Sequence, residues 1–210
     1  MKTQRQTNDV LNSDVGGVYK SSIIENLKLY PKTTLIFVMT CFSLALHLYS
    51  TRILNASYEL SKFPVPYYEA QLSFSADKIK EWYSYIIEEQ TLGIYLKTQH
   101  IDFIFISSVL LLHFFALMLI SRFYPQDNKG RKLLIVCALV STIAPLADIV
   151  ENLISYVMLA SPNDFPDWLA FLYSFSAAIK FAMFTFAYIT AAIGLLIGIF
   201  VYFKSVMTSE

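Results

Sequence analysis

Charged and amide side chains interrupt two of the longest apolar stretches of the chain. Asp148, Glu151 and Asn152 lie inside LLIVCALVSTIAPLADIVENLISYVMLA, and Lys180 lies inside WLAFLYSFSAAIKFAMFTFAYITAAIGLLIGIFVYF. A charged side chain at the centre of a membrane helix costs roughly 2.5–3.5 kcal/mol. Two acids and a lysine would therefore cost on the order of 8–10 kcal/mol if they were unpaired. We expect these side chains to point into a helical bundle and to pair with one another.

Composition indicates a membrane protein. The chain is 56% hydrophobic and 15% charged, whereas charged residues make up about a quarter of a soluble domain. The formal net charge is zero, so nothing favours a nucleic acid partner. The chain has no HExxH motif and no glycine-rich phosphate loop. We therefore expect the lipid bilayer as its main partner, and neither a metal nor a cofactor.

Four apolar stretches are long enough to cross a bilayer as helices. They cover about residues 33–51, 101–121, 133–160 and 168–203. The predicted fold is all-α: one polytopic membrane four-helix bundle over residues 33–204, with polar tails at 1–32 and 205–210. Pro145 cannot donate to the carbonyl of Ser141, so a kink is expected in the third span.

The distribution of lysine and arginine predicts the orientation. Both the N-terminal tail and the connection RFYPQDNKGRK are basic, whereas the connection SPNDFPD has no basic residue. By the positive-inside rule, the N and C termini and the second connection are cytoplasmic, and the first and third connections face outward.

The first outer connection, at about residues 52–100, contains one strong helix signal. Ile79, Trp82, Tyr83, Ile86 and Ile87 recur at the spacing of one helix face. Ser75 can cap the start of this helix and Gly93 can end it. We expect an amphipathic helix at about residues 76–91 on the outer surface.

The ionisable residues of the spans are expected to share one layer in the outer half of the bundle. At 1.5 Å per residue, Lys180 lies about 18 Å inward from Trp168, and Asp148 and Glu151 lie roughly 18 and 14 Å inward from Ala160. We predict that Lys180 pairs with Asp148 or Glu151. The candidate residues for ligand or ion binding are Asp102, Asp148, Glu151, Asn152, Lys180 and His47.

Several functions fit this layer. Paired buried charges can be a structural lock that fixes which helices pack together, as in a membrane scaffold. The surplus of acids over one lysine also suits the binding or transport of a proton or a cation. A third possibility is an outward-facing cavity that holds a lipid or another small ligand. The alternative is a membrane-embedded enzyme that acts on a lipid-like substrate through the same cluster.

Small residues in the fourth span allow close helix approach. Gly194 and Gly198 form a GxxxG pattern. The pattern suits packing within the bundle, and a seam between two copies of the chain, giving a homo-oligomer, is the alternative.

Asp102, the stretch Asp148-Ile-Val-Glu151-Asn152 and Lys180 also carry a resemblance. Over about residues 75–190 the chain resembles uncharacterised bacterial four-span membrane proteins with a DxxEN motif in the third span. In those proteins a long outer loop precedes an acid at the start of the second span. The resemblance implies a location in the bacterial cytoplasmic (inner) membrane and a shared site or lock, and it implies no particular activity.

Overall fold

A computed structural model describes residues 24–207, which form helices and connections with no strand in that range. The helices are α2 (Thr33–Leu60), α3 (Tyr67–Gln71), α4 (Ala76–Glu88), α5 (Leu92–Ser121), α6 (Lys129–Val140), α7 (Ile143–Ala160) and α8 (Asp167–Met207). Residues 24–29 are also helical. The tails predicted at 1–32 and 205–210 lie largely outside the described residues.

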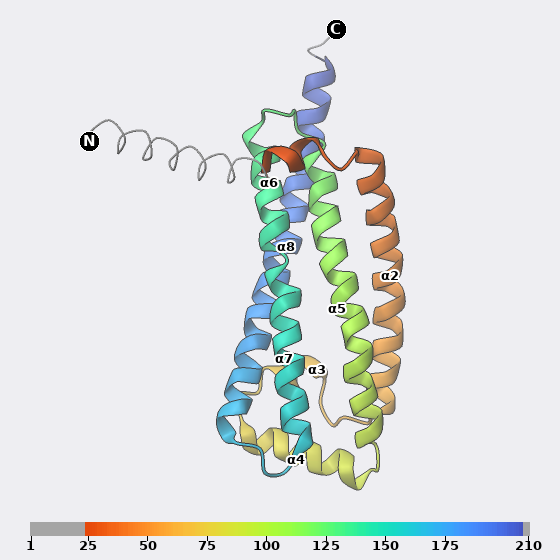
Figure 1. Cartoon of the computed structure of the whole chain (residues 1–210), viewed down its shortest axis with the longest axis vertical. Coiled ribbons are helices and arrows are strands. Elements are labelled where there is room, and N and C mark those ends of the chain that lie inside the picture. Colours follow the sequence, from red (N-terminus) through yellow and green to blue (C-terminus); the bar gives the residue numbers. More distant parts are fainter. Residues whose placement is uncertain (1–23, 208–210) are drawn as a thin grey trace, which may run out of the picture.

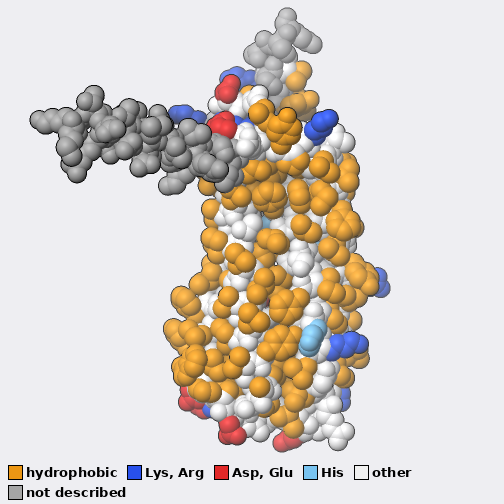
Figure 2. Space-filling model, viewed as in Figure 1, with side chains coloured by type: hydrophobic (Ala, Val, Ile, Leu, Met, Phe, Trp, Pro, Cys, Tyr) orange, Lys and Arg blue, Asp and Glu red, His pale blue; other side chains and the backbone are white. Residues whose placement is uncertain are grey.

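Within residues 24–207, four helical segments are long and apolar enough to cross a membrane: α2, α5, the pair α6 and α7, and α8. They lie side by side along the long axis of the molecule (Figure 1). Apolar side chains cover most of the face seen in Figure 2, as contact with acyl chains requires. The prediction of an all-α bundle with four spans is confirmed.

The helices on either side of the first connection are longer than the apolar stretches. α2 continues past Thr51 to Leu60, and α5 begins at Leu92. Packing explains the extension, because the hydroxyl groups of Ser57 on α2 and Thr98 on α5 lie 2.7 Å apart in this polar part. The connection between the two helices is therefore shorter than the predicted 52–100.

The amphipathic helix predicted at about 76–91 is present as α4, which lies across one end of the bundle (Figure 1). Its start is capped by Ser75, whose hydroxyl accepts from the backbone N–H of Lys78 at 3.4 Å. Its buried residues are Ile79, Tyr83 and Ile86, whereas Ile87, expected on the same face, is exposed. Gly93 does not end this helix, since it lies in the first turn of α5.

A stripe of serines joins α2 to α5. The buried residues of α2 are Ile36, Ser43, Ser50 and Ser57, spaced seven apart. A seven-residue spacing keeps the stripe on one face of a gently supercoiled helix pair. Small side chains let the two backbones approach, and hydroxyl groups bond across the seam. Ser50 and Ser108 show this, with their hydroxyl oxygens 3.0 Å apart.

The third span is interrupted, as Pro145 predicts. α6 ends at Val140 and α7 begins at Ile143, with Ser141 and Thr142 between them. The backbone N–H of Thr142 bonds to the carbonyl of Leu139, three residues back, at 3.2 Å. The carbonyl of Ser141, to which Pro145 cannot donate, accepts instead from the backbone N–H of Ala144 at 3.4 Å.

Gly194 and Gly198 are both buried within this chain. A Cβ added at Gly194 would lie 2.7 Å from the side chain of Leu134 on α6, and one at Gly198 would lie 2.9 Å from the Tyr124 ring. The phenol of Tyr124 also donates to the carbonyl of Gly194 at 2.7 Å. These glycines therefore serve packing inside the bundle, which is the first of the two uses expected for them.

The apolar core has two parts. One lies at the α4 end of the bundle and includes Tyr83, Met158 and Tyr173. The other lies towards the opposite end and includes Ile36, Met118 and Ile135. Along the third span, Asp148, Glu151 and Asn152 fall between these two parts. The polar layer therefore lies between two apolar cores.

Candidate functional site

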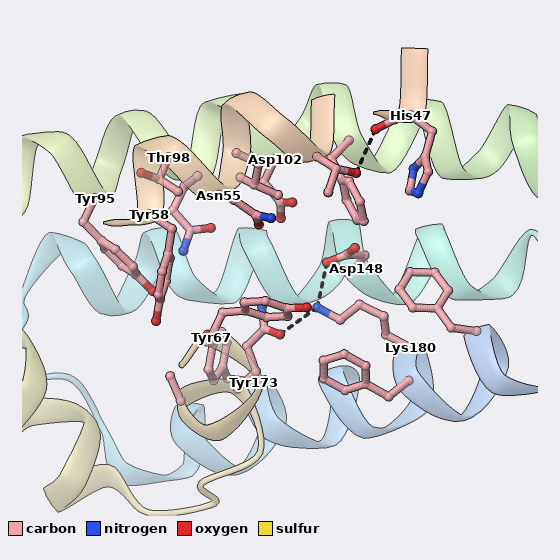
Figure 3. Close-up of a pocket in the computed structure, with 18 of the residues that line it drawn as sticks. His47, Asn55, Tyr58, Tyr67, Tyr95, Thr98, Asp102, Asp148, Tyr173 and Lys180 are labelled. Carbon is pink, nitrogen blue, oxygen red and sulfur yellow. Dashed lines mark hydrogen bonds and ion pairs between the residues drawn. The ribbon is translucent and has the colours of Figure 1, made fainter. Parts of the chain in front are cut away.

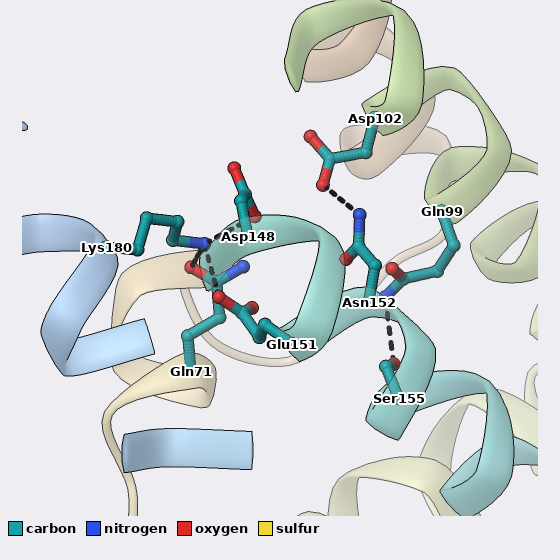
Figure 4. Close-up of polar contacts among 8 residues, drawn as sticks. All are labelled: Gln71, Gln99, Asp102, Asp148, Glu151, Asn152, Ser155 and Lys180. Atoms are coloured by element: carbon teal, nitrogen blue, oxygen red, sulfur yellow. Dashed lines mark hydrogen bonds and ion pairs between the residues drawn. The ribbon is translucent and has the colours of Figure 1, made fainter. Parts of the chain in front are cut away.

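The ammonium group of Lys180 is held between two acids from α7. Its Nζ lies 3.0 Å from Asp148 Oδ1 and 2.5 Å from Glu151 Oε2 (Figure 4). Asp148 and Glu151 are three residues apart, so both project from the same face of α7 towards α8. The prediction that Lys180 pairs with one of these acids understates the contact, since it pairs with both.

A second set of polar contacts joins α7 to α5. The side-chain amide of Asn152 donates to Asp102 Oδ2 at 2.7 Å, and the amide of Gln99 donates to the Ser155 hydroxyl at 3.1 Å (Figure 4). α7 is thus tied to α8 through an ion pair and to α5 through amides. Each of these bonds fixes the register of two helices.

Glu151 and Asn152 lie in the closed part of the layer. All the residues of the layer on α7 and α8 are buried, Asp148 and Lys180 included, but Glu151 and Asn152 do not line the cavity described next. Glu151 Oε1 has no hydrogen-bond partner among residues 24–207. Access from outside does not reach these two side chains, which suits a role in holding the helices together.

Asp102, Asp148 and Lys180, in contrast, line a cavity of about 480 Å³. Ligand pockets in proteins measure about 300–1,000 Å³, so a small molecule fits. Figure 3 shows Asp102 of α5 and Lys180 of α8 on opposite walls, with Asp148 of α7 between them. The other polar lining residues include Asn55, Gln71, Thr98 and Gln99.

Aromatic rings form the rest of the wall. Tyrosine rings gather at one end, where Tyr58 meets Tyr95 edge-on with ring centroids 6.3 Å apart (Figure 3). Phenylalanine rings line another part, namely Phe105, Phe181 and Phe184. The cavity therefore offers hydrogen-bonding groups at its centre and apolar surface beside them.

The short helix α3 closes part of the cavity. Gln71 Oε1 accepts from Lys180 Nζ at 3.2 Å, and the backbone N–H of Phe74 donates to the Ser174 hydroxyl on α8 at 3.0 Å. These bonds hold the segment after α2 inside the mouth of the bundle. The connection between α2 and α4 thus supplies part of the site.

The cavity opens sideways between α2 and α8. α2 packs along α5, whereas α8 packs on α7, α5 and α6. The exposed lining residues are Asn55 on α2, Tyr67 on α3, and Thr185 and Tyr188 on α8. Asn55, Thr185 and Tyr188 belong to candidate spans, so this part of the opening faces the position of the lipid.

His47 lines the cavity apart from the charged contacts. Its Nδ1 lies 3.3 Å from the Ser108 hydroxyl, and its ring packs against Phe105 with centroids 5.3 Å apart. His113 is buried against Phe184 and Tyr188, and its ring nitrogens have no hydrogen-bond partner within the described chain. In residues 24–207 no group of three or more histidine, cysteine or acidic side chains is arranged to hold a metal.

Sequence reasoning missed the contributions of the segment between the first two apolar stretches. Gln71, Tyr58 and Tyr95 line the site, yet they precede or follow the apolar stretches. No spacing rule points to Gln71, since its contact depends on where α3 docks. The serine stripe of α2 was visible as a seven-residue repeat and would have identified the helix face that meets α5.

The fold and the buried charges together define a helical membrane protein with a polar layer inside its bundle. Comparisons with protein-family models, with curated proteins and with solved structures give no match.

Proposed function

We propose that this protein binds a small amphiphilic molecule that enters the cavity from the bilayer. The observation that carries this proposal is the position of Asp102, Asp148 and Lys180 on the wall of a cavity that opens between α2 and α8. A charged layer that served only to hold the helices together would be surrounded by protein side chains on all sides. Polar groups beside aromatic walls suit a ligand with one polar head and an apolar body.

The charged layer divides into two roles in this proposal. Glu151 and Asn152 lock α7 to its neighbours, because they are inaccessible and each contacts another helix. Asp102 and Asp148 present carboxyl groups to the ligand. Lys180 belongs to both parts, since it pairs with Glu151 and also lines the cavity.

We further propose that the chain lies in the bacterial cytoplasmic membrane with both termini in the cytoplasm. The basic connection between α5 and α6 lies at the same end of the bundle as the start of α2 and the end of α8 (Figure 1), and the positive-inside rule assigns that end to the cytoplasm. The cavity then lies in the outer half of the bundle. A ligand of the outer leaflet would reach it without crossing the membrane.

Blocking the opening tests the proposal. In lipid nanodiscs, the saturable binding of tritiated phenylbutanol is measured after subtraction of empty nanodiscs. Thr185→Trp places an indole at the mouth of the cavity and should weaken binding at least tenfold, about 1.4 kcal/mol. Ile193→Trp is the matched control, because Ile193 is an exposed residue of the same helix outside the cavity lining.

Two results would overturn the proposal: absence of saturable binding to the wild-type protein, or equal binding by both tryptophan variants. Monodisperse elution of Thr185→Trp and an unfolding midpoint close to that of Ile193→Trp would establish that the variant is folded.

A further inference from the structure

Asp102 is the acid of the cavity that lacks a cationic partner. Lys180 pairs with Asp148 and Glu151, and in residues 24–207 no lysine, arginine or histidine forms an ion pair with Asp102. The carboxyl group of Asp102 accepts one hydrogen bond, from the Asn152 amide at 2.7 Å. This bond fixes the orientation of the carboxyl group without supplying a charge.

The charges of the layer do not balance. The layer holds three carboxyl groups (Asp102, Asp148 and Glu151) but one ammonium group, which pairs with Asp148 and Glu151. A buried carboxylate without a counter-charge is strongly disfavoured. A bound cation would supply that charge, and the cavity beside Asp102 has the room for it.

The walls of the same cavity also suit a cation with an organic body. Tyr58, Tyr95 and Phe105 line the same cavity, and aromatic faces attract ammonium groups within about 6 Å of the ring centroid. Phe181 and Phe184 on α8 offer an apolar surface on which a hydrocarbon body can pack. An inorganic cation would use the carboxyl group and leave these surfaces empty.

We infer that the ligand class of the cavity is an amphiphilic amine, with its ammonium group on Asp102 and its apolar body between Phe105 and the phenylalanines of α8. This inference rests on the proposed function, because it needs the cavity to admit a ligand. It goes further by assigning Asp102 as the counter-ion and a positive charge to the ligand head.

The test compares two probes that differ in the head group. Saturable binding of tritiated phenylbutylamine and of tritiated phenylbutanol is measured on the full chain in nanodiscs, with empty nanodiscs subtracted. The wild-type protein should bind the amine at least tenfold more tightly than the alcohol. Asp102→Asn keeps the size and the acceptor for Asn152 but removes the charge, so it should abolish this preference and retain alcohol binding.

Two further variants serve as controls. Asp102→Glu keeps the carboxylate and should retain a preference for the amine, which separates loss of charge from local misfolding. Glu88→Gln removes an exposed acid of α4, outside the cavity lining, and should bind both probes as the wild type does.

The outcomes separate the two proposals. Equal binding of both probes by the wild type, or an unchanged preference in Asp102→Asn, would overturn the assignment of a cationic ligand and leave the cavity as a binding site. Absence of saturable binding of either probe would overturn both proposals.

Discussion

Replacing Lys180 by methionine is the sharpest perturbation of the charged layer. Methionine fills a similar volume and removes the ammonium group, whose Nζ lies 3.0 Å from Asp148, 2.5 Å from Glu151 and 3.2 Å from Gln71. Lys180 is 4% exposed, so its contacts with the two acids are buried. Removing one partner of a buried ion pair costs about 3–5 kcal/mol. Since two acids lose their partner, we expect a loss near the upper end of that range.

The assay is reversible unfolding of the purified protein in mixed micelles, with the free energy of unfolding compared between variants. The control combines Lys180→Met with Asp148→Asn and Glu151→Gln, which removes all the formal charges of the contact. Neutral replacement of a buried ion pair is often close to neutral in stability. The triple variant should therefore regain most of the loss.

A loss of less than about 1 kcal/mol in Lys180→Met would contradict the reasoning, because that is the range of an exposed ion pair. Failure of the triple variant to regain stability would also contradict it. In that case the cost would come from packing of the lysine stem rather than from its charge.

Two predictions concern packing between the spans, and both use the same unfolding assay. Ser50→Leu places a large side chain in the close seam between α2 and α5, where Ser50 is 0% exposed. It should destabilise the protein by about 1–3 kcal/mol. An unchanged free energy of unfolding would mean that the two helices can move apart and would contradict the close packing. Gly194→Leu inserts a side chain where even an added Cβ would lie 2.7 Å from Leu134, so a loss of about 1–3 kcal/mol is expected. Leu195→Ala, at an exposed position of the same helix, should have little effect, and an equal loss there would argue against close packing at the glycine.

The sequence was sufficient to predict the spans and the charged layer. The spans follow because apolar runs of about 20 residues form helices in lipid. The charged layer follows because a charge inside such a helix is costly unless it finds a partner. Lys180, Asp148 and Glu151 could be placed at one depth from the rise of a helix alone. Their mutual contact in the structure is the result of that constraint.

The shape of the site could not be predicted, because it depends on how non-adjacent segments dock. The cavity exists where α2 and α8 stand apart, and part of its wall is Gln71 on a short helix. Neither the gap nor that contact leaves a periodic signal in the sequence. In the sequence, Asp102 and Glu151 are both acids in apolar stretches and cannot be told apart. Only the packing shows that Asp102 lines the cavity, as a binding group would, whereas Glu151 is enclosed between helices and holds them together.

Photolabelling tests the central claim most directly, namely that a polar cavity inside the bundle receives molecules from the lipid. A diazirine analogue of phenylbutanol would be activated in nanodiscs and the labelled peptides mapped by mass spectrometry. We predict that labelling concentrates on residues 47–58 and 180–188 and falls when excess phenylbutanol competes for the cavity. Labelling spread evenly over lipid-facing residues such as Leu196 and Phe200, with no change on competition, would contradict the account.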